Sequence, residues 1–276
     1  MQKNVFTLEA EVLENAPAGE RYRRIVLAAP EIAAAAQPGQ FVNLRVTRAL
    51  EPLLARPFGV FWADPAAGRV ELLYKQAGRG TQILSGVAAG QRLPLSGPLG
   101  NTFRADESAD VHLTVGGGTG LAPMYFLSAR LAAAGRKALM LFGFRDCSFR
   151  LPEGLMRRAG APWRVASDAG EAGCHHGTAV DLLRSLLDGE LAGTRAALYA
   201  AGPAIMMKLV AGLAAERNLP CLVSLESRMA CGLSVCRGCV VRAFGPDGQS
   251  VNRTVCTYGP VFRAAEVDWA HYCSLG

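Results

Sequence analysis

Hydrophobic and polar residues alternate along the first hundred residues of the chain, as they do in half-buried β-strands. Turn residues such as Pro17, Gly19, Pro30 and Gly39 separate the alternating runs. The runs cover residues 5–12, 22–27, 41–46, 59–62 and 70–74. Many short strands at this spacing predict a small antiparallel β-barrel, which we place over residues 1–104.

The pattern changes beyond residue 105, where apolar runs alternate with segments of helical periodicity. Buried strands are predicted at residues 111–115, 138–142, 164–166, 196–200 and 222–225, and helices at residues 121–131, 180–187 and 205–216. This alternation predicts an α/β domain over residues 105–220, with a parallel sheet, helices on both faces and ligands at the carboxyl ends of its strands. Residues 221–276 are left as a small third module. The chain is thus predicted to be an α+β multidomain protein.

Composition narrows the class of protein. The chain has 276 residues, of which 50% are hydrophobic and 19% charged, as in globular domains with sizeable cores. No apolar run reaches the ~18–20 residues of a membrane span, and the early charges do not fit a signal peptide, so we expect a cytoplasmic protein. The net charge of +6 comes without a basic run, which argues against nucleic-acid binding. Bound nucleotides or an acidic partner would balance this charge.

Four of the eight cysteines follow a spacing that indicates a metal centre. Four residues separate Cys231 from Cys236, two separate Cys236 from Cys239, and sixteen precede Cys256. This is the plant-type ferredoxin spacing for a 2Fe–2S cluster. A structural zinc site is the alternative, but zinc usually takes two short C-x2–4-C knuckles and only one is complete here. The other cysteines are expected to be ordinary thiols, namely Cys147, Cys174, Cys221 and Cys273.

Two motifs in the predicted barrel suit phosphate binding. Residues 56–59 read Arg-Pro-Phe-Gly, so the planar guanidinium of Arg56 stands at the start of a strand and can grip a pyrophosphate. Lys75 follows another strand, and residues 78–81, Gly-Arg-Gly-Thr, open a helical pattern whose first N–H groups can bind phosphate. Each motif alone is also common in plain turns.

A glycine run in the second half suits a dinucleotide. Residues 116–120 read Gly-Gly-Gly-Thr-Gly and lie between a predicted strand and a predicted helix, where a pyrophosphate meets a helix N-terminus. A tight turn would explain two of these glycines but hardly four. Gly202 and Pro203 follow another strand at an equivalent position. We therefore expect a nucleotide site at these two strand ends.

Taken together, the motifs resemble a known family. The order R-P-F, G-x-G-T, G-G-G-x-G and A-G-P is similar to that of the ferredoxin–NADP reductase superfamily. Residues 224–239, which contain S-L-E-S-R-M-A-C-G, and residues 259–262, G-P-V-F, resemble the electron-transfer subunits of NAD-dependent (class 1B) dihydroorotate dehydrogenases. The resemblance extends from the barrel to about residue 262.

The resemblance implies three cofactor sites. It implies FAD at Arg56, Pro57, Phe58, Gly59, Leu73, Tyr74, Lys75, Gly80 and Thr81. It implies NAD at Gly116, Gly117, Gly118, Thr119, Gly120, Gly202 and Pro203, and the 2Fe–2S cluster on Cys231, Cys236, Cys239 and Cys256. Two positions depart from the family pattern, because Gly59 stands where serine is usual and Thr119 where an aliphatic residue is common.

The resemblance also implies a partner and a direction of electron flow. The partner is an FMN-containing catalytic subunit that oxidises dihydroorotate in pyrimidine biosynthesis, in a heterotetramer of two plus two chains. Electrons pass from its FMN through the cluster and FAD to NAD, and no acid or base of this chain is needed. The alternatives are an NAD(P)H–ferredoxin reductase or sulfide dehydrogenase subunit of the same architecture, and a non-enzymatic module with zinc on the cysteines.

Overall fold

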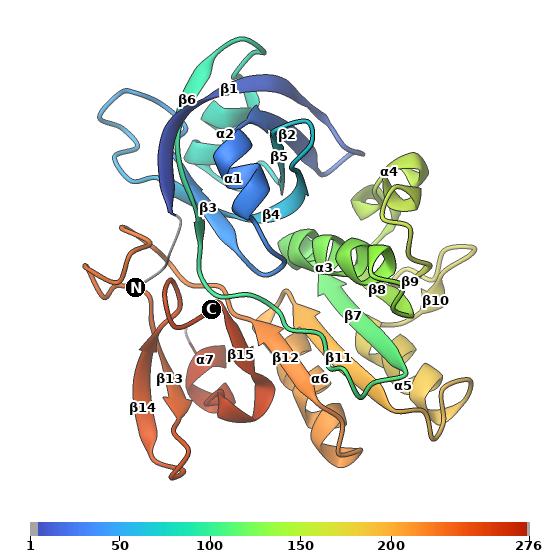
Figure 1. The fold of residues 1–276 in the computed structure, drawn as a ribbon. Helices are drawn as coiled ribbons and strands as arrows, with labels where there is room; N and C mark the ends of the chain where they lie inside the picture. Colours follow the sequence, from blue (N-terminus) through green and yellow to red (C-terminus); the bar gives the residue numbers. More distant parts are fainter. Residues whose placement is uncertain (1–4, 275–276) are drawn as a thin grey trace.

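The computed structural model describes residues 5–274, and its N-terminal part is a closed barrel (Figure 1). The strand order is β1-β2-β5-β4-β3-β6, and every pairing is antiparallel. The strands are β1 (Phe6–Pro17), β2 (Arg23–Ala28), β3 (Phe41–Leu44), β4 (Arg56–Asp64), β5 (Arg69–Tyr74) and β6 (Arg92–Leu99). Two short helices belong to this part, α1 (Pro30–Ala35) and α2 (Arg79–Ser85). The predicted antiparallel barrel is confirmed.

The second part is a seven-stranded sheet in the order β10-β9-β8-β7-β11-β12-β15. Its strands are β7 (Val111–Gly117), β8 (Ala138–Phe144), β9 (Trp163–Ser167), β10 (His175–His176), β11 (Ala196–Ala201), β12 (Cys221–Ser224) and β15 (Val261–Arg263). All pairings are parallel except that between β12 and β15. The predicted parallel sheet is confirmed, and β15 adds an antiparallel edge that the sequence pattern did not predict.

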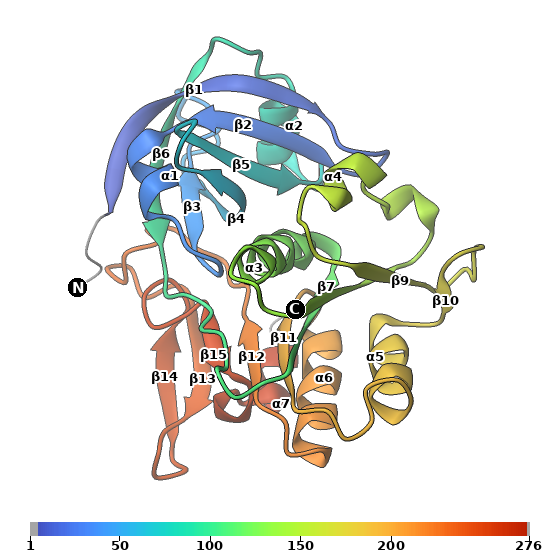
Figure 2. The same ribbon diagram turned by 45° about the vertical axis from the view of Figure 1, so that its right-hand side comes forward.

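Helices cover both faces of this sheet, as predicted. Helix α3 (Leu121–Ala133) lies between the sheet and the barrel, contacting β7 and β8 on one side and β4 on the other (Figures 1 and 2). This position explains why ten of its thirteen residues are buried. Helices α5 (Ala179–Asp188) and α6 (Ala204–Glu216) cover the opposite face. The short α4 (Glu153–Arg157) lies between β8 and β9 in the chain.

The C-terminal part is joined closely to both others. Residues 231–239, which hold three of the four spaced cysteines, form a loop that we call the cysteine loop. It is followed by the hairpin of β13 (Val240–Phe244) and β14 (Ser250–Thr254), and α7 (Trp269–Cys273) ends the described chain. Cys239 and Cys256 lie in one hydrophobic core with Phe41 and Leu99 of the barrel. Because β12 and β15 both belong to the large sheet, strands beyond residue 220 complete the parallel-sheet part. The domain boundaries given above stay predictions.

Within residues 5–274, no helix combines the length and the apolar character needed to cross a lipid bilayer.

Candidate functional site

A cavity of about 280 Å³ opens where the barrel, the large sheet and the segment before the cysteine loop meet. Its wall includes nine of the predicted cofactor residues, namely Pro57, Phe58, Gly59, Leu73, Tyr74, Lys75, Thr81, Thr119 and Gly120. The first six come from the start of β4 and from the end of β5 with the residue after it, because these antiparallel strands begin and end, respectively, at this side of the barrel. The structure therefore brings the barrel motifs and part of the glycine run to one cavity. Their roles in binding stay predictions.

Arg56 and Gly80 lie next to each other beside this cavity but do not line it. A Cβ atom on Gly80 would lie 2.8 Å from Nε of Arg56, so the guanidinium occupies the space that a side chain at residue 80 would fill. Nη1 of Arg56 donates a 2.6 Å hydrogen bond to the carbonyl oxygen of Leu54. This contact uses one edge of the fork and fixes the direction of the guanidinium.

The hydroxyl of Thr81 closes the loop before α2. Its oxygen accepts hydrogen bonds from the backbone N–H groups of Ala77, at 3.0 Å, and Gly78, at 3.1 Å. Two N–H groups of this loop are thus satisfied within the chain. Any phosphate at this loop depends on the remaining N–H groups and on the cations nearby.

Tyr22 is a member of the site that we expected only as a strand residue. Its hydroxyl donates a 3.0 Å hydrogen bond to the carbonyl oxygen of Gly118, which ties the barrel to the glycine run. Nζ of Lys75 lies 6.0 Å from the centre of the Tyr22 ring and 5.5 Å from that of Phe149. Burial raises the pKa of Tyr22 to about 12, so its hydroxyl stays protonated and remains a donor. No sequence motif marks this tyrosine.

Packing between two strand ends requires several of the glycines. A Cβ atom on Gly120 would lie 2.2 Å from the backbone of Ala201, at the end of β11. Gly202 has φ +143°, and a Cβ atom there would lie 2.6 Å from the carbonyl oxygen of Gly117. Pro203 follows as the N-cap residue of α6. The ends of β7 and β11 thus touch through their backbones, and this contact alone accounts for Gly120 and Gly202.

Glu226 links the glycine run to the segment before the cysteine loop. The hydroxyl of Thr119 donates a 3.0 Å hydrogen bond to Oε1 of Glu226. The backbone of Glu226 is held in turn by the hydroxyl of Tyr272, which accepts from its N–H at 2.9 Å and donates to its carbonyl oxygen at 3.0 Å. Glu226 lies in the S-L-E-S-R-M string that carries the resemblance, which by itself implies no role for this residue. This segment also lines the cavity, with Ser224, Leu225, Glu226, Ser227 and Met229.

The four predicted ligands lie on one loop and its neighbour as two pairs. The Sγ atoms of Cys231 and Cys236 are 3.3 Å apart. In the second pair, the backbone N–H of Cys256 donates to Sγ of Cys239 at 3.4 Å, and both residues are buried. Two thiols for each of two irons is the arrangement that a 2Fe–2S cluster needs.

Backbone N–H groups point at the sulfur atoms. Leu233 donates to Sγ of Cys231 at 3.3 Å, and Ser234 donates to Sγ of Cys256 at 3.2 Å. Burial raises the pKa of Cys231, but the backbone donors of Cys236 and Leu233 outweigh burial and lower that pKa to about 7. Burial raises the pKa of Cys256 to about 12. Donors directed at sulfur stabilise thiolates bound to iron, so the residues fit an iron–sulfur cluster.

Two family models match the chain. The model for the iron–sulfur cluster binding domain of dihydroorotate dehydrogenase B matches residues 226–268, and the model for an oxidoreductase FAD-binding domain matches residues 15–103. The first range contains all four cysteines of the two pairs, and the second contains the barrel motifs.

Curated relatives align over most of the chain. The dihydroorotate dehydrogenase B (NAD(+)) electron transfer subunit of Desulforamulus reducens is 36% identical over 87% of this chain and 90% of its own length. The corresponding subunit of Bacillus caldolyticus is 35% identical over 90% of this chain and 93% of its own length.

Solved structures share the fold. The structure of an NADH-dependent reduced ferredoxin–NADP oxidoreductase superposes with a TM-score of 0.83 at 27% identity, covering 97% of this chain and 92% of that one. A ferredoxin reductase of carbazole 1,9a-dioxygenase superposes with a TM-score of 0.67 at 20% identity, covering 78% of this chain and 67% of that one. The second likeness concerns the fold alone.

Proposed function

This chain belongs to the family of dihydroorotate dehydrogenase B electron transfer subunits, and we propose that it carries electrons between a dihydroorotate-oxidising catalytic subunit and NAD. The predicted FAD domain and iron–sulfur domain are confirmed by the family models that match them. The zinc alternative for the cysteines is thereby set aside. The chain is an NAD-dependent oxidoreductase subunit of pyrimidine biosynthesis.

One observation supports this function most directly. The cavity that collects the barrel motifs is also lined by Met229, two residues before Cys231, and by Thr119 and Gly120 of the glycine run. A flavin in this cavity would therefore have the nicotinamide site on one side and the cysteine loop on the other. That order is the one in which electrons have to pass.

We assign the FAD site to the barrel residues and the NAD site to the strand ends, as the resemblance implies. Arg56 would hold the FAD pyrophosphate with the edge of its fork that Leu54 leaves open. Gly116–Gly118 would let the protein backbone approach the NAD pyrophosphate closely, while Thr119, Gly120, Gly202 and Pro203 would form the rest of the NAD site at the two strand ends. Cys231, Cys236, Cys239 and Cys256 would ligate the cluster. When bound, FAD supplies the exchange between a hydride and single electrons. The chain itself would bind FAD and NAD, orient them relative to each other and exclude water from between them.

The partner is a catalytic subunit, and we propose that it contains FMN and that two copies of each chain form a heterotetramer. The cysteine loop would be the docking face, because electrons have to pass between the partner and the cluster there. Two apolar side chains of this loop are exposed, Leu233 at 50% and Val235 at 83%, and the exposed Arg228 and Arg237 flank them. An apolar centre with cations around it suits a partner surface with acidic groups.

The test compares the isolated chain with the complex. With FAD and cluster loaded, the isolated chain is expected to reduce ferricyanide with NADH and to leave dihydroorotate unchanged until the catalytic subunit is added. Arg237→Glu is expected to weaken coupling to the partner more than the NADH–ferricyanide activity. Arg92→Glu is the matched control, because Arg92 is an exposed arginine at the start of β6 that pairs with Glu11 of β1. Turnover of dihydroorotate by the chain alone would contradict the function. Full-rate reduction of a ferredoxin without the partner would favour the reductase alternative.

A further inference from the structure

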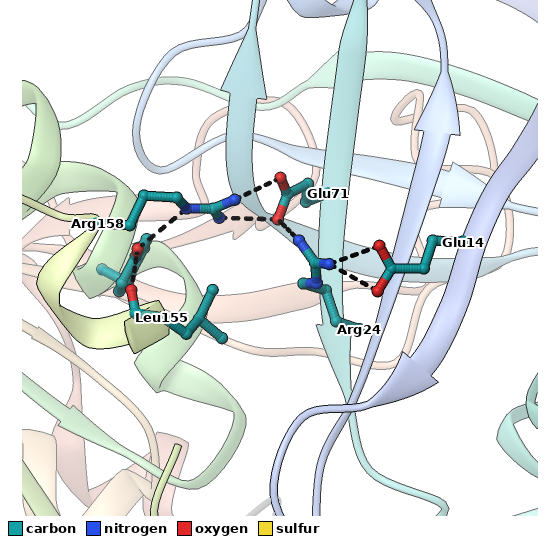
Figure 3. A network of polar contacts seen from close by, with 6 residues as sticks. Glu14, Arg24, Glu71, Leu155 and Arg158 are labelled. Carbon is teal, nitrogen blue, oxygen red and sulfur yellow. Dashed lines mark hydrogen bonds and ion pairs between the residues drawn. The ribbon is translucent and has the colours of Figure 1, made fainter. Parts of the chain in front are cut away.

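A buried carboxylate joins the barrel to the nucleotide-binding part. Glu71 of β5 lies between two arginines, with its side chain 8% exposed (Figure 3). Arg158, which follows α4, donates to both carboxylate oxygens, at 2.7 and 2.8 Å. Arg24 of β2 donates to Oε2 at 3.0 Å, and its other nitrogen holds Glu14 of β1. Parallel two-point contacts between a guanidinium and a carboxylate fix geometry as well as charge.

Arg158 has further partners in the barrel. Its guanidinium lies over the ring of Trp62, with Cζ 4.6 Å from the ring centre. Beside it, Tyr125 of α3 stacks on Phe61 of β4, with ring centres 4.2 Å apart, and donates a 2.6 Å hydrogen bond to the carbonyl oxygen of Leu155. Elements α3, α4, β4 and β5 therefore meet at one point, which we call the Glu71–Arg158 latch.

The latch lies on the elements that carry both cofactor motifs. Strand β5 runs from Glu71 directly to Leu73 and Tyr74 in the cavity wall, and β4 carries Phe58 and Gly59. On the other side, α3 begins at the residue after Gly120, so the helix held by the latch is the one that follows the glycine run. A shift of α3 against β4 would move the two motifs relative to each other.

We propose that Glu71 and Arg158 are positioning residues that set the distance between the nicotinamide and flavin sites. The inference rests on the proposed function, because it takes FAD on the barrel and NAD on the glycine run. Domains of one chain move relative to each other unless their interface prevents it. Hydride transfer needs the reacting atoms ≈ 3–3.5 Å apart, and a 1 Å displacement can cost about 100-fold in rate. A rigid two-point contact at the interface meets that need.

The last residue of α4, immediately before Arg158, provides a matched control. Arg157 neighbours Arg158, but it pairs with Glu153 within α4, and both of these side chains are about two-thirds exposed. Arg157→Met removes the same charge as Arg158→Met without touching the barrel. Any effect of overall charge is common to both variants.

The first measurement is rapid mixing of the loaded protein with NADH. In Arg158→Met we expect the rate of flavin reduction at saturating NADH to fall about 100-fold, as for a displacement of about 1 Å, with a smaller change in the NADH concentration that half-saturates it. Electron passage from photoreduced flavin to the cluster should keep its rate, since within residues 5–274 the polar and ring contacts of Glu71 and Arg158 lie on β2, β4, α3 and each other, away from the cysteine loop. A variant that is merely destabilised would lose both rates together.

The second measurement does not depend on activity. Hydrogen exchange of the purified full chain should quicken in Arg158→Met at β4 and at the first turn of α3, but not in Arg157→Met. If Arg158→Met is recovered poorly, Arg158→Lys keeps the charge and loses the fork, and it should show the same pattern with a smaller loss. Unchanged flavin reduction in loaded Arg158→Met or Arg158→Lys protein would overturn the latch. Wild-type protein that NADH fails to reduce would instead overturn the proposed function.

Discussion

The side-chain amide of Asn43, in barrel strand β3, donates a 3.2 Å hydrogen bond to the carbonyl oxygen of Cys231. Asn43 is 7% exposed and lies opposite Pro57 in the β3–β4 pairing. One hydrogen bond therefore links β3, the strand beside the Arg-Pro-Phe-Gly motif, to the first cysteine of the cysteine loop. The next residue, Gly232, is buried and has φ +70°.

Gly232→Ala is expected to disrupt this contact. The new Cβ atom would lie 2.3 Å from Nδ2 of Asn43, so Asn43 or the loop would have to move. Overpacking of this kind costs about 1–3 kcal/mol, and the positive φ adds about 1–2 kcal/mol. Gly248→Ala is the control, because Gly248 has φ +75° with open space around it. Iron content and urea unfolding should show a larger loss at Gly232, and equal losses would rule out the clash.

Cys236→Ser is expected to remove the cluster. Serine oxygen is a poor substitute for a soft thiolate, so iron retention should weaken by more than the ~10–100-fold that a lost supporting contact costs. Cys147→Ser, at an exposed thiol outside the two pairs, should retain its iron. Iron analysis and the visible spectrum of anaerobically purified protein provide the comparison. Full iron occupancy in the Cys236 variant would contradict the ligand assignment.

Arg56→Ala is expected to weaken FAD binding by one to two orders of magnitude. A charge-assisted hydrogen bond contributes about 1.5–3 kcal/mol, and this guanidinium is the cation that Gly80 leaves room for. Flavin titration of the variant measures the change. Arg92→Ala provides the control, since Arg92 is a largely exposed arginine of β6. Stoichiometric FAD in purified Arg56→Ala protein would place the phosphate site elsewhere.

His112 should make the stability of the protein depend on pH below about 6.5. It is 1% exposed in β7, with Nδ1 3.1 Å from the Tyr199 hydroxyl, and burial lowers its pKa from 6.5. Between its folded and unfolded pKa values, only the unfolded chain takes up this proton. The contribution is therefore complete above pH 6.5 and is lost as the pH falls, by at most about 1.4 kcal/mol per pH unit.

Urea unfolding of the wild type and of His112→Gln between pH 5 and 7 isolates the contribution of His112 to the free energy of unfolding. The free energy of unfolding of the wild type should fall more steeply with decreasing pH than that of the variant. Parallel curves would show that His112 titrates alike in the folded and unfolded chains.

Local patterns predicted the elements, because the information that forms them is local. Alternation along residues 5–12 and the helical period of residues 205–216 reflect the faces that β1 and α6 bury. The cysteine spacing likewise predicted the metal centre, since a cluster loop is nearly continuous in sequence. The NAD role of the glycine run stays a prediction, because strand packing also requires glycines at 120 and 202.

Contacts between distant residues could not be predicted in this way. The hydrogen bond from Tyr22 to Gly118 and that from Thr119 to Glu226 depend on how whole domains pack. Tyr22 reads as one more strand aromatic, and Glu226 as one acidic residue among many. Strand β15 has only three residues, which is too short to show a period. Its place at the edge of the sheet follows from pairing with β12.

The pairing of β12 with β15 governs how the cluster can move. Ser224 and Val261 are partners in that pairing, so residues 225–260, which contain the four predicted cluster ligands, leave and rejoin the sheet at one pair of residues. The two stems are held at the strand spacing of about 4.8 Å. A carrier tethered by one flexible linker searches for its partner by diffusion, but this module is clamped at both ends. The cluster is therefore held in a fixed position relative to the sheet. The rate of electron transfer between flavin and cluster is expected to be independent of solvent viscosity.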